Sequence, residues 1–193
     1  MINLSEYFFN ELDEHSIVLE AAKSSLEKNF IDAVEVCKNS IISNGKLIFF
    51  GNGGSAADAQ HLATELTVKF SKERMPIPAI ALTTDTSSLT AIGNDFGFER
   101  IFSRQVEALG RKNDVVIAIS TSGNSENIIQ GAKMAKSLGI HVIAFTGMSG
   151  GGLSEISDTT IKIPSSKVSR IQEMHITIGQ MLCNALELSL GLV

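Results

Sequence analysis

Two residues that can transfer protons or bind a metal follow a glycine-rich turn in this chain. His61 and Glu65 stand four positions apart, so they share one face of the helix expected there. Just before them, Gly51-Asn52-Gly53-Gly54-Ser55 follows the apolar run 46–50. The glycines let a ligand approach the main chain, and the start of the helix offers free N–H groups to an anion. This arrangement predicts chemistry on a phosphorylated small molecule.

A second cluster of polar residues, Ser120-Thr121-Ser122-Gly123-Asn124-Ser125, follows the apolar run 114–119. Its hydroxyl groups can donate hydrogen bonds to phosphate oxygens, aided by the N–H groups and the dipole of the next helix. The alternative is simple helix capping, which needs one such residue and not four. Because the chain has neither G-x-x-x-x-G-K-[ST] nor G-x-G-x-x-G, nucleotide binding is disfavoured.

The roles of the other polar residues stay open at this point. His61 and Glu65 could form a general-base pair, a metal-binding pair or a surface ion pair. In the apolar segment 168–190, Gln172 and Gln180 lie about 80° apart around a helix, and His175 lies about 60° from Gln172 on the other side. Periodicity alone does not choose between Gln180 and His175 as a site residue. Asn94-Asp95, between two glycines, is interpreted as a turn.

The elements that position these residues alternate along the chain. Helices are expected at 4–27, 30–43, 55–69, 87–92, 98–109, 124–137 and 168–190, with a short one after 147–152; strands are expected at 46–50, 79–82, 114–119, 140–145 and 159–163. The short helix at 87–92 is expected to end at Gly93-Asn94-Asp95. Such alternation predicts a parallel, doubly wound α/β sheet in a single domain, 1–193, with ligands bound at the carboxyl ends of the strands.

Composition narrows the class of protein. A net charge of −5 argues against a general nucleic-acid binder, and no apolar run approaches the roughly 20 residues of a membrane span. Cys37 and Cys183 lack metal-site spacing, so they are expected to be reduced core thiols of a cytoplasmic protein. The segment 168–190 is apolar nearly all round, which together with the apolar N-terminal helix predicts a homo-oligomer.

Several motifs together strongly resemble the phosphoheptose isomerase (sedoheptulose 7-phosphate isomerase) family of the sugar-isomerase, or SIS, superfamily. They are Gly51-Asn52-Gly53-Gly54-Ser55, Ala59-Gln60-His61, Glu65-Leu66-Thr67, Ile92-Gly93-Asn94-Asp95, Ser120-Thr121-Ser122-Gly123-Asn124-Ser125 and Arg170-Ile171-Gln172-Glu173. The resemblance implies a three-layer α/β/α sandwich of the flavodoxin-like type with a five-stranded parallel sheet and extra N-terminal helices. It also implies a homotetramer with sites between subunits, and one zinc ion per subunit.

The resemblance further implies the reaction and its residues. Sedoheptulose 7-phosphate would become D-glycero-D-manno-heptose 7-phosphate through an enediolate, for heptose in lipopolysaccharide or capsule. Glu65 would be the base, and zinc would be held by His61, Glu65, Gln172 and Gln180. The substrate would contact Asn52, Gly53, Gly54, Ser55, Glu65, Asn94, Asp95 and Gln172, with its phosphate on Ser120, Thr121, Ser122 and Ser125.

Two positions depart from the family pattern. The family has a histidine, its second catalytic group, where this chain has Gln180, and an amide cannot shuttle a proton near neutral pH. Lys69 stands where the family usually has arginine. Related SIS proteins that bind the replication initiator without catalysis are the alternative, because they lack a histidine at the Gln180 position. They also lack the carboxylate at the Glu65 position, so Glu65 favours the enzyme.

Overall fold

A computed structural model describes residues 2–193, and a parallel sheet of five strands forms its centre. The strands are β1 (Leu47–Gly51), β2 (Ala79–Ala81), β3 (Val115–Ser120), β4 (His141–Thr146) and β5 (Thr159–Lys162). Their order across the sheet is β2-β1-β3-β4-β5, with all neighbouring pairs parallel. This is the flavodoxin-like order, so the predicted fold class is confirmed.

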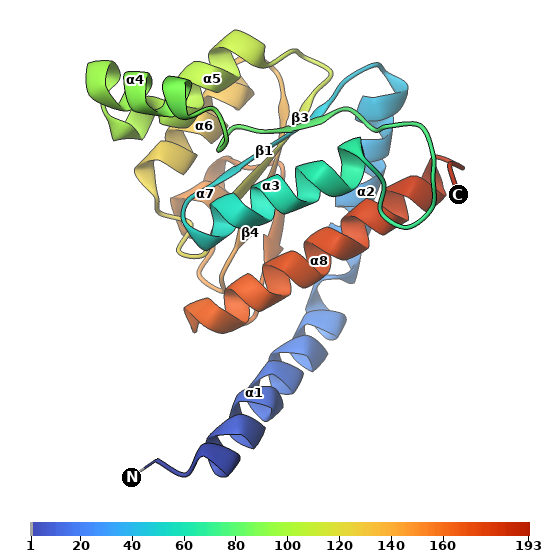
Figure 1. Ribbon diagram of the computed structural model, residues 1–193, viewed down its shortest axis with the longest axis vertical. Helices are drawn as coiled ribbons and strands as arrows, with labels where there is room; N and C mark the ends of the chain where they lie inside the picture. Colours follow the sequence, from blue (N-terminus) through green and yellow to red (C-terminus); the bar gives the residue numbers. More distant parts are fainter. Residues whose placement is uncertain (1) are drawn as a thin grey trace.

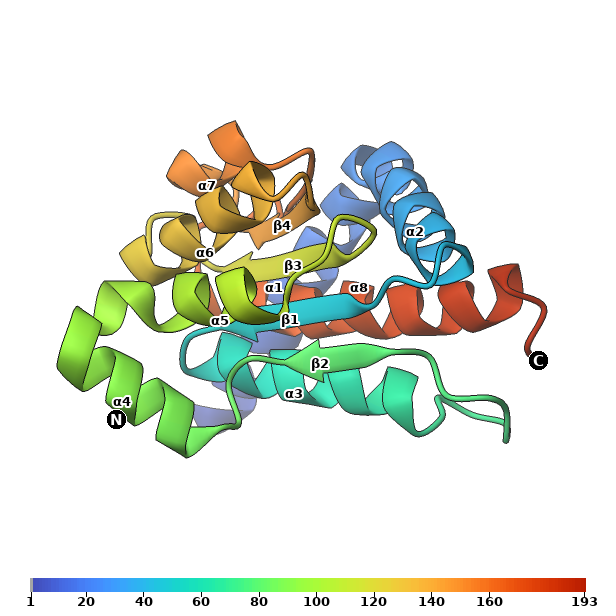
Figure 2. The same cartoon turned by 90° about the horizontal axis from the view of Figure 1, so that it is seen from above.

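Helices cover both faces of the sheet and complete three layers (Figure 2). One face packs against α2 (Glu27–Ile42), α3 (Gly54–Thr67) and α8 (Val168–Ser189); the other packs against α5 (Ile101–Leu109), α6 (Glu126–Ser137) and α7 (Gly151–Ile156). Successive residues of β1 serve the two sides, since Phe49 lies in one apolar cluster and Phe50 in the other. Strands buried on both faces explain the nearly continuous apolar runs in the sequence.

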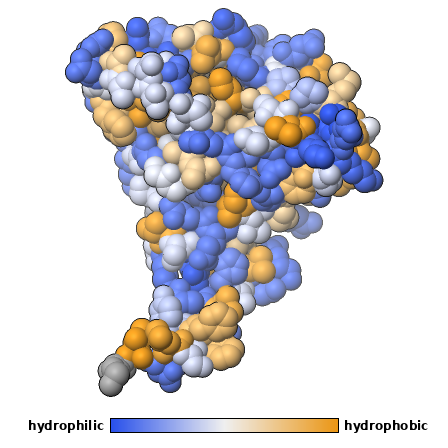
Figure 3. Space-filling model, in the orientation of Figure 1, coloured by the Kyte–Doolittle hydropathy of each residue, from blue (hydrophilic) through white to orange (hydrophobic). Residues whose placement is uncertain are grey.

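The first helix, α1 (Leu4–Ser25), projects from the body of the molecule (Figure 1). Ion pairs join it to the start of α8: Lys167 Nζ lies 2.9 Å from Glu11 Oε1, and His15 Nδ1 lies 2.7 Å from Glu173 Oε2. Beyond these contacts, hydrophobic side chains gather at the free end of α1 (Figure 3). The exposed ones are Leu4, Tyr7, Phe8 and Phe9, and Leu12 and Ile17 are exposed further along α1.

The structure corrects the boundaries of two helices. The short helix expected at 87–92 is α4, which runs from Thr86 to Phe96, so the turn interpretation of Asn94-Asp95 is wrong. Its start is fixed by Asp85, whose Oδ1 accepts from Ser88 N at 3.0 Å, and it ends at Gly97, which has a φ of +91°. Likewise α2 begins at Glu27, three residues before the expected start, because Leu26 keeps a helical φ and ψ.

The remaining predictions about the chain's interior can also be compared with the structure. Cys37 and Cys183 are free and buried, which confirms their place in the core, and burial raises the pKa of both thiols. The 3₁₀ turn Phe98–Arg100 leads into α5, so the helical segment expected there is confirmed. Across residues 2–193, none of the helices is both long enough and apolar enough to cross a lipid bilayer.

Candidate active site

The two polar loops of the sequence meet where the strand order reverses. The loop after β1 and the loop after β3 leave the carboxyl ends of neighbouring strands, because β1 pairs with β3 in parallel. Asn52 and Asn127 join the two loops, each side chain donating to the other's amide oxygen at 2.8 Å. In doubly wound sheets this switch point is the usual place for a ligand. Both polar loops therefore lie at the carboxyl edge of the sheet.

Backbone geometry fixes the shape of the loop Ser120–Ser125, called the serine loop below. Gly123 has a φ of +67°, and a β-carbon there would lie 2.0 Å from the carbonyl oxygen of Gly150. Its N–H is directed to Ser120, whose Oγ accepts at 3.2 Å. On the far side, Gly152 N donates to Asn124 Oδ1 at 3.0 Å. Only glycine fits at position 123, and the hydroxyl groups consequently keep one arrangement around the turn.

The hydroxyl of Ser125 is not used to cap α6. Ser125 occupies the N-cap position, yet among the described residues its side chain makes no capping hydrogen bond to the helix backbone. Instead Ser120 Oγ donates to Ser125 Oγ at 3.3 Å, and Ser122 Oγ accepts from Asn124 N at 3.1 Å. Simple capping therefore does not account for Ser125, and the start of α6 keeps N–H groups that can face an anion.

The face of α8 that meets α3 carries Gln180. The side-chain nitrogen of Gln180 contacts His61 Nε2 and lies 3.4 Å from Glu65 Oε1. His61 Nε2 and Glu65 Oε1 are 3.0 Å apart, with 51% of the histidine side chain and 22% of the glutamate side chain exposed. The three predicted residues are thus brought together from two helices, and the cluster opens to solvent.

Gln172 also lies at the contact between α3 and α8, called the seam below, about two turns before Gln180. A β-carbon on Gly54, the first residue of α3, would lie only 2.6 Å from Gln172 Nε2. Gly54 therefore makes room for the glutamine amide at the start of the helix. The structure places Gln172 at the start of α3, beside the glycine-rich loop.

His175 is directed into the protein interior and not into this seam. It is 1% exposed, its Nε2 lies 3.2 Å from Thr146 O, and its ring packs against Phe145. Burial lowers the pKa of His175 to about 4, so the imidazole is neutral at neutral pH. Its Nδ1 has no hydrogen-bond partner among residues 2–193. The structure therefore assigns Gln180, and not His175, to the face with His61 and Glu65.

The other predicted substrate contacts lie outside the cluster of His61, Glu65 and Gln180. Ser55 is buried beneath the first loop, against the backbone at Gly51, whereas Gly53 has a φ of +55° and open space around it. Asn94 and Asp95 are exposed at the end of α4. Their one side-chain hydrogen bond within the described residues joins them to each other, Asn94 Nδ2 donating to Asp95 Oδ1 at 2.8 Å.

Two residues of this region were not singled out from the sequence. Asn127 is buried and holds Asn52, but a lone asparagine one residue inside a helix carries no recognisable signal. Asp58 lies one turn before His61 on α3. Its Oδ2 is buried without a hydrogen-bond partner among residues 2–193, and burial raises the pKa of this carboxyl group. The pattern Asp-x-x-His on one helix face was the available signal.

The chemistry of the donor set decides whether the zinc ion implied by the resemblance fits this seam. Two ligands of tetrahedral zinc lie about 3.4 Å apart, close to the separation of His61 Nε2 and Glu65 Oε1. Within residues 2–193, no three His, Cys, Asp or Glu side chains are grouped to hold a metal. Of the two predicted amide ligands, Gln180 contacts this pair, whereas the amide of Gln172 lies at Gly54, seven residues before His61 on α3. These residues are consistent with a metal, but amide oxygens are weaker ligands than imidazole.

Comparisons with known proteins agree with this geometry. The SIS domain model matches residues 11–147. The phosphoheptose isomerase of Aquifex aeolicus is 55% identical over 160 residues, which cover 83% of this chain and 84% of that protein. The probable phosphoheptose isomerase of Thermoplasma acidophilum is 53% identical over 175 residues, covering 89% and 96%. The structure of the phosphoheptose isomerase from Neisseria gonorrhoeae superposes with a TM-score of 0.91 at 42% identity, covering 96% of this chain and 99% of that one.

Proposed function

Because this chain belongs to the phosphoheptose isomerase family of SIS-domain proteins, we propose that it converts sedoheptulose 7-phosphate into D-glycero-D-manno-heptose 7-phosphate. The observation that carries this proposal is Glu65, a carboxylate held beside an imidazole on the helix that follows the glycine-rich loop. Conversion of the ketose to the aldose, followed by NMR, tests it. The product would supply heptose for lipopolysaccharide or capsule.

The reaction needs a base at the first two carbons of the sugar. Glu65 removes a proton from C1 of the open-chain ketose, which gives an enediolate, and a proton is then returned to C2. The carbonyl at C2 becomes a hydroxyl group while the hydroxyl at C1 becomes an aldehyde, so no atom is gained or lost. A zinc ion, when bound, would stabilise the negative charge of the enediolate.

The phosphate end of the substrate binds at the serine loop. Ser120, Thr121, Ser122 and Ser125 donate hydrogen bonds to the phosphate oxygens, and the free N–H groups at the start of α6 add to them. The Asn52–Asn127 pair fixes this loop against the loop after β1. Asn52, Gly53, Gly54, Ser55 and Gln172 then line the path from the phosphate toward Glu65, with Asn94 and Asp95 as further sugar contacts.

The set of metal ligands in the proposal is His61, Glu65, Gln172 and Gln180. The proton on the C1 hydroxyl must also reach the oxygen at C2, and a second acid–base group normally carries it. Gln180 occupies the place of that group beside His61, but its amide does not titrate near neutral pH. The chain is therefore an isomerase of low activity with weakly held zinc.

The active form in the proposal is a homotetramer with its sites between subunits. The apolar side chains of α1 named above are exposed, and His61 is half exposed. A second subunit would bury the apolar face and exclude water from the site. Free, buried cysteines fit a reducing compartment, so we assign the enzyme to the cytoplasm.

The regulator that binds the replication initiator is the less favoured function. The relatives reported above carry isomerase names, and Glu65 keeps the carboxylate that the regulators lack. Besides the fold, the resemblance gives the absence of a histidine at position 180 as a feature shared with them. Turnover of the sugar phosphate separates the two functions, because a non-catalytic regulator shows none.

A further inference from the structure

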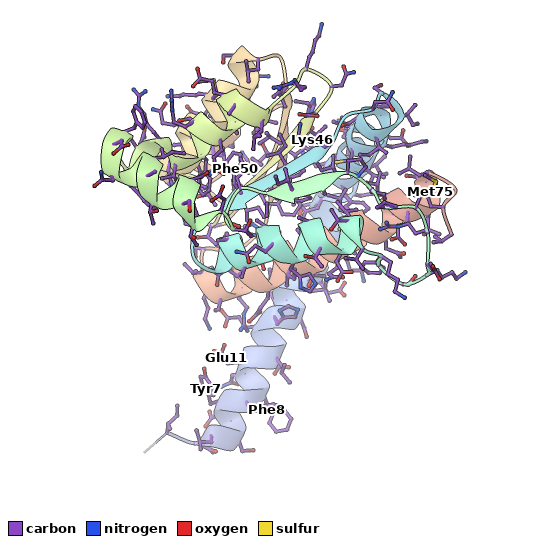
Figure 4. All side chains as sticks on the ribbon, turned by 45° about the horizontal axis from the view of Figure 1, so that its top comes forward. Tyr7, Phe8, Glu11, Lys46, Phe50 and Met75 are labelled. Atoms are coloured by element: carbon purple, nitrogen blue, oxygen red, sulfur yellow. The ribbon has the colours of Figure 1, made fainter. Side chains whose placement is uncertain are left out.

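A buried ion pair lies below the candidate site, between α8 and the loop that connects α3 to β2. The side chains of Arg74 and Glu187 are 1% and 0% exposed, and Arg74 Nη2 lies 2.6 Å from Glu187 Oε1. Figure 1 shows this loop passing beside the C-terminal part of α8, and Figure 4 shows the neighbouring Met75 there. Two charges removed from water this completely carry a large desolvation cost, so the pair needs an explanation.

Each nitrogen of the Arg74 guanidinium has a hydrogen-bond partner. Nε and Nη2 contact Glu187 Oε1 at 2.6 Å, and Nη1 donates to the carbonyl oxygens of Leu66 and Met75 at 2.8 and 2.9 Å. The remaining donor, on Nη2, reaches the carbonyl oxygen of Glu65 at 2.9 Å. Because α3 ends at Thr67, the carbonyl groups of Glu65 and Leu66 lack partners within the helix. Arg74 thus caps the turn that carries Glu65.

Glu187 extends the link to α8. Its Oε1 also accepts from Phe70 N at 2.9 Å, so the loop after α3 is tied to α8 at two points. Glu187 lies seven residues after Gln180, almost two full turns, and therefore on nearly the same face of α8. One side chain, Arg74, consequently bonds to the backbone of Glu65 and to the helix that presents Gln180.

We propose that Arg74 is a positioning residue that sets Glu65 relative to the face of α8 carrying Gln180. The proposal rests on the role of Glu65 as the base in the function above. A purely stabilising role explains the pair less well, since apolar residues of similar size commonly give equal or better stability than a buried ion pair. In addition, Glu187 Oε2 has no hydrogen-bond partner within residues 2–193, so the pair is not optimised for stability.

The chain offers a matched control at the start of β1, outside the seam between α3 and α8. Lys46 Nζ lies 2.6 Å from the buried carboxylate of Asp114 and donates to the carbonyl oxygen of Leu109, the last residue of α5, at 2.8 Å. This pair also joins a cation, a buried carboxylate and a helix C-terminus. Figure 4 shows Lys46 and Phe50 at opposite ends of β1, so Lys46 lies at the edge of the sheet away from the loops that follow β1 and β3.

The test compares the double variants Arg74→Met/Glu187→Gln and Lys46→Met/Asp114→Asn. Both keep an acceptor for backbone N–H groups, and both are made in the unmodified chain and in Gln180→His. We expect the first to lower kcat for sedoheptulose 7-phosphate by roughly 10- to 100-fold, because a small displacement of the base costs that much. The KM of this variant should stay close to the parent value, because the serine loop that binds the phosphate is unchanged. The control leaves both constants unchanged.

Three outcomes decide the proposal. Equal kcat in the Arg74→Met/Glu187→Gln variant and its parent overturns it, and so does an equal loss in the Lys46→Met/Asp114→Asn control. Should the first double variant fail to fold by circular dichroism, Arg74→Lys decides, because lysine keeps the charge but offers three donors in place of five. Full kcat in Arg74→Lys overturns the proposal. If instead no parent turns over the substrate, the proposed function itself has failed.

Discussion

The side-chain amide of Gln180 contacts the imidazole of His61 across the seam between two helices, although the residues are 119 positions apart in the chain. The amide nitrogen also lies 3.4 Å from the Glu65 carboxylate. A second imidazole at this place would add a nitrogen ligand and a group that titrates near neutral pH. In the seam between α3 and α8, Gln180 therefore stands where the resemblance implies a histidine.

Replacing Gln180 by histidine should raise zinc content and isomerase turnover together. The second imidazole supplies a better ligand than an amide oxygen, and an acid–base group typically contributes 10²–10⁴-fold in rate. Metal content after dialysis and the turnover number check the two effects. If the unmodified chain already holds stoichiometric zinc and turns over as fast as Gln180→His, this account of the seam is wrong.

His175→Ala serves as the control for that experiment. The imidazole of His175 lies against the carbonyl oxygen of Thr146 in the interior, so its removal should leave the metal content nearly intact. Loss of metal binding in a folded His175→Ala protein would show that the wrong face of α8 has been assigned to the site.

Simultaneous replacement of Ser122 and Ser125 by alanine should weaken binding of the sugar phosphate. Each hydrogen bond to a charged phosphate oxygen contributes about 1.5–3 kcal/mol, so the double variant loses a large part of the affinity. Isothermal titration of the folded protein measures it. Ser137→Ala, at the other end of α6, is the matched control. Unchanged affinity in the double variant rules out the serine loop as the phosphate site.

A single methyl group at position 54 should disturb Gln172. The β-carbon of Gly54→Ala would lie 2.6 Å from Gln172 Nε2, so the flexible glutamine side chain has to move away from the loop. We expect the variant to fold and to lose roughly 10-fold in kcat/KM, since displaced contacts reduce the population of productive geometry. Gly93→Ala, whose nearest neighbour would lie at 3.9 Å, is the control. Equal activity in the two variants contradicts a role for Gln172.

Burial of His175 should make the folded protein less stable in mild acid. Its pKa is about 4 in the folded chain and about 6.5 when unfolded, so the unfolded chain binds the extra proton between these values. The free energy of unfolding therefore falls as the pH decreases from 6.5, by about 2 kcal/mol at pH 5 from this group. Urea unfolding at pH 7 and pH 5 measures it. The fall should be smaller by that amount in His175→Gln.

Local patterns allowed the strands, the helix order and both polar loops to be predicted, because each depends on residues close together in the sequence. Distant partners that no recognised motif marks escaped prediction. Asn127 matters through Asn52, and Arg74 matters through Glu187, more than a hundred residues away. Helical periodicity also placed His175 and Gln180 on two comparably polar faces. The packing of α8 against β4 places His175 in the interior, and its packing against α3 places Gln180 in the seam.

The most direct measurement is the conversion of sedoheptulose 7-phosphate, followed by NMR, with the unmodified chain and with Gln180→His, each with and without added zinc. The account predicts appearance of the aldose signal in both proteins, slowly in the unmodified chain and much faster in Gln180→His with zinc. Absence of aldose in all four samples, with both proteins folded and oligomeric, would contradict the assignment of this chain as a sugar-phosphate isomerase.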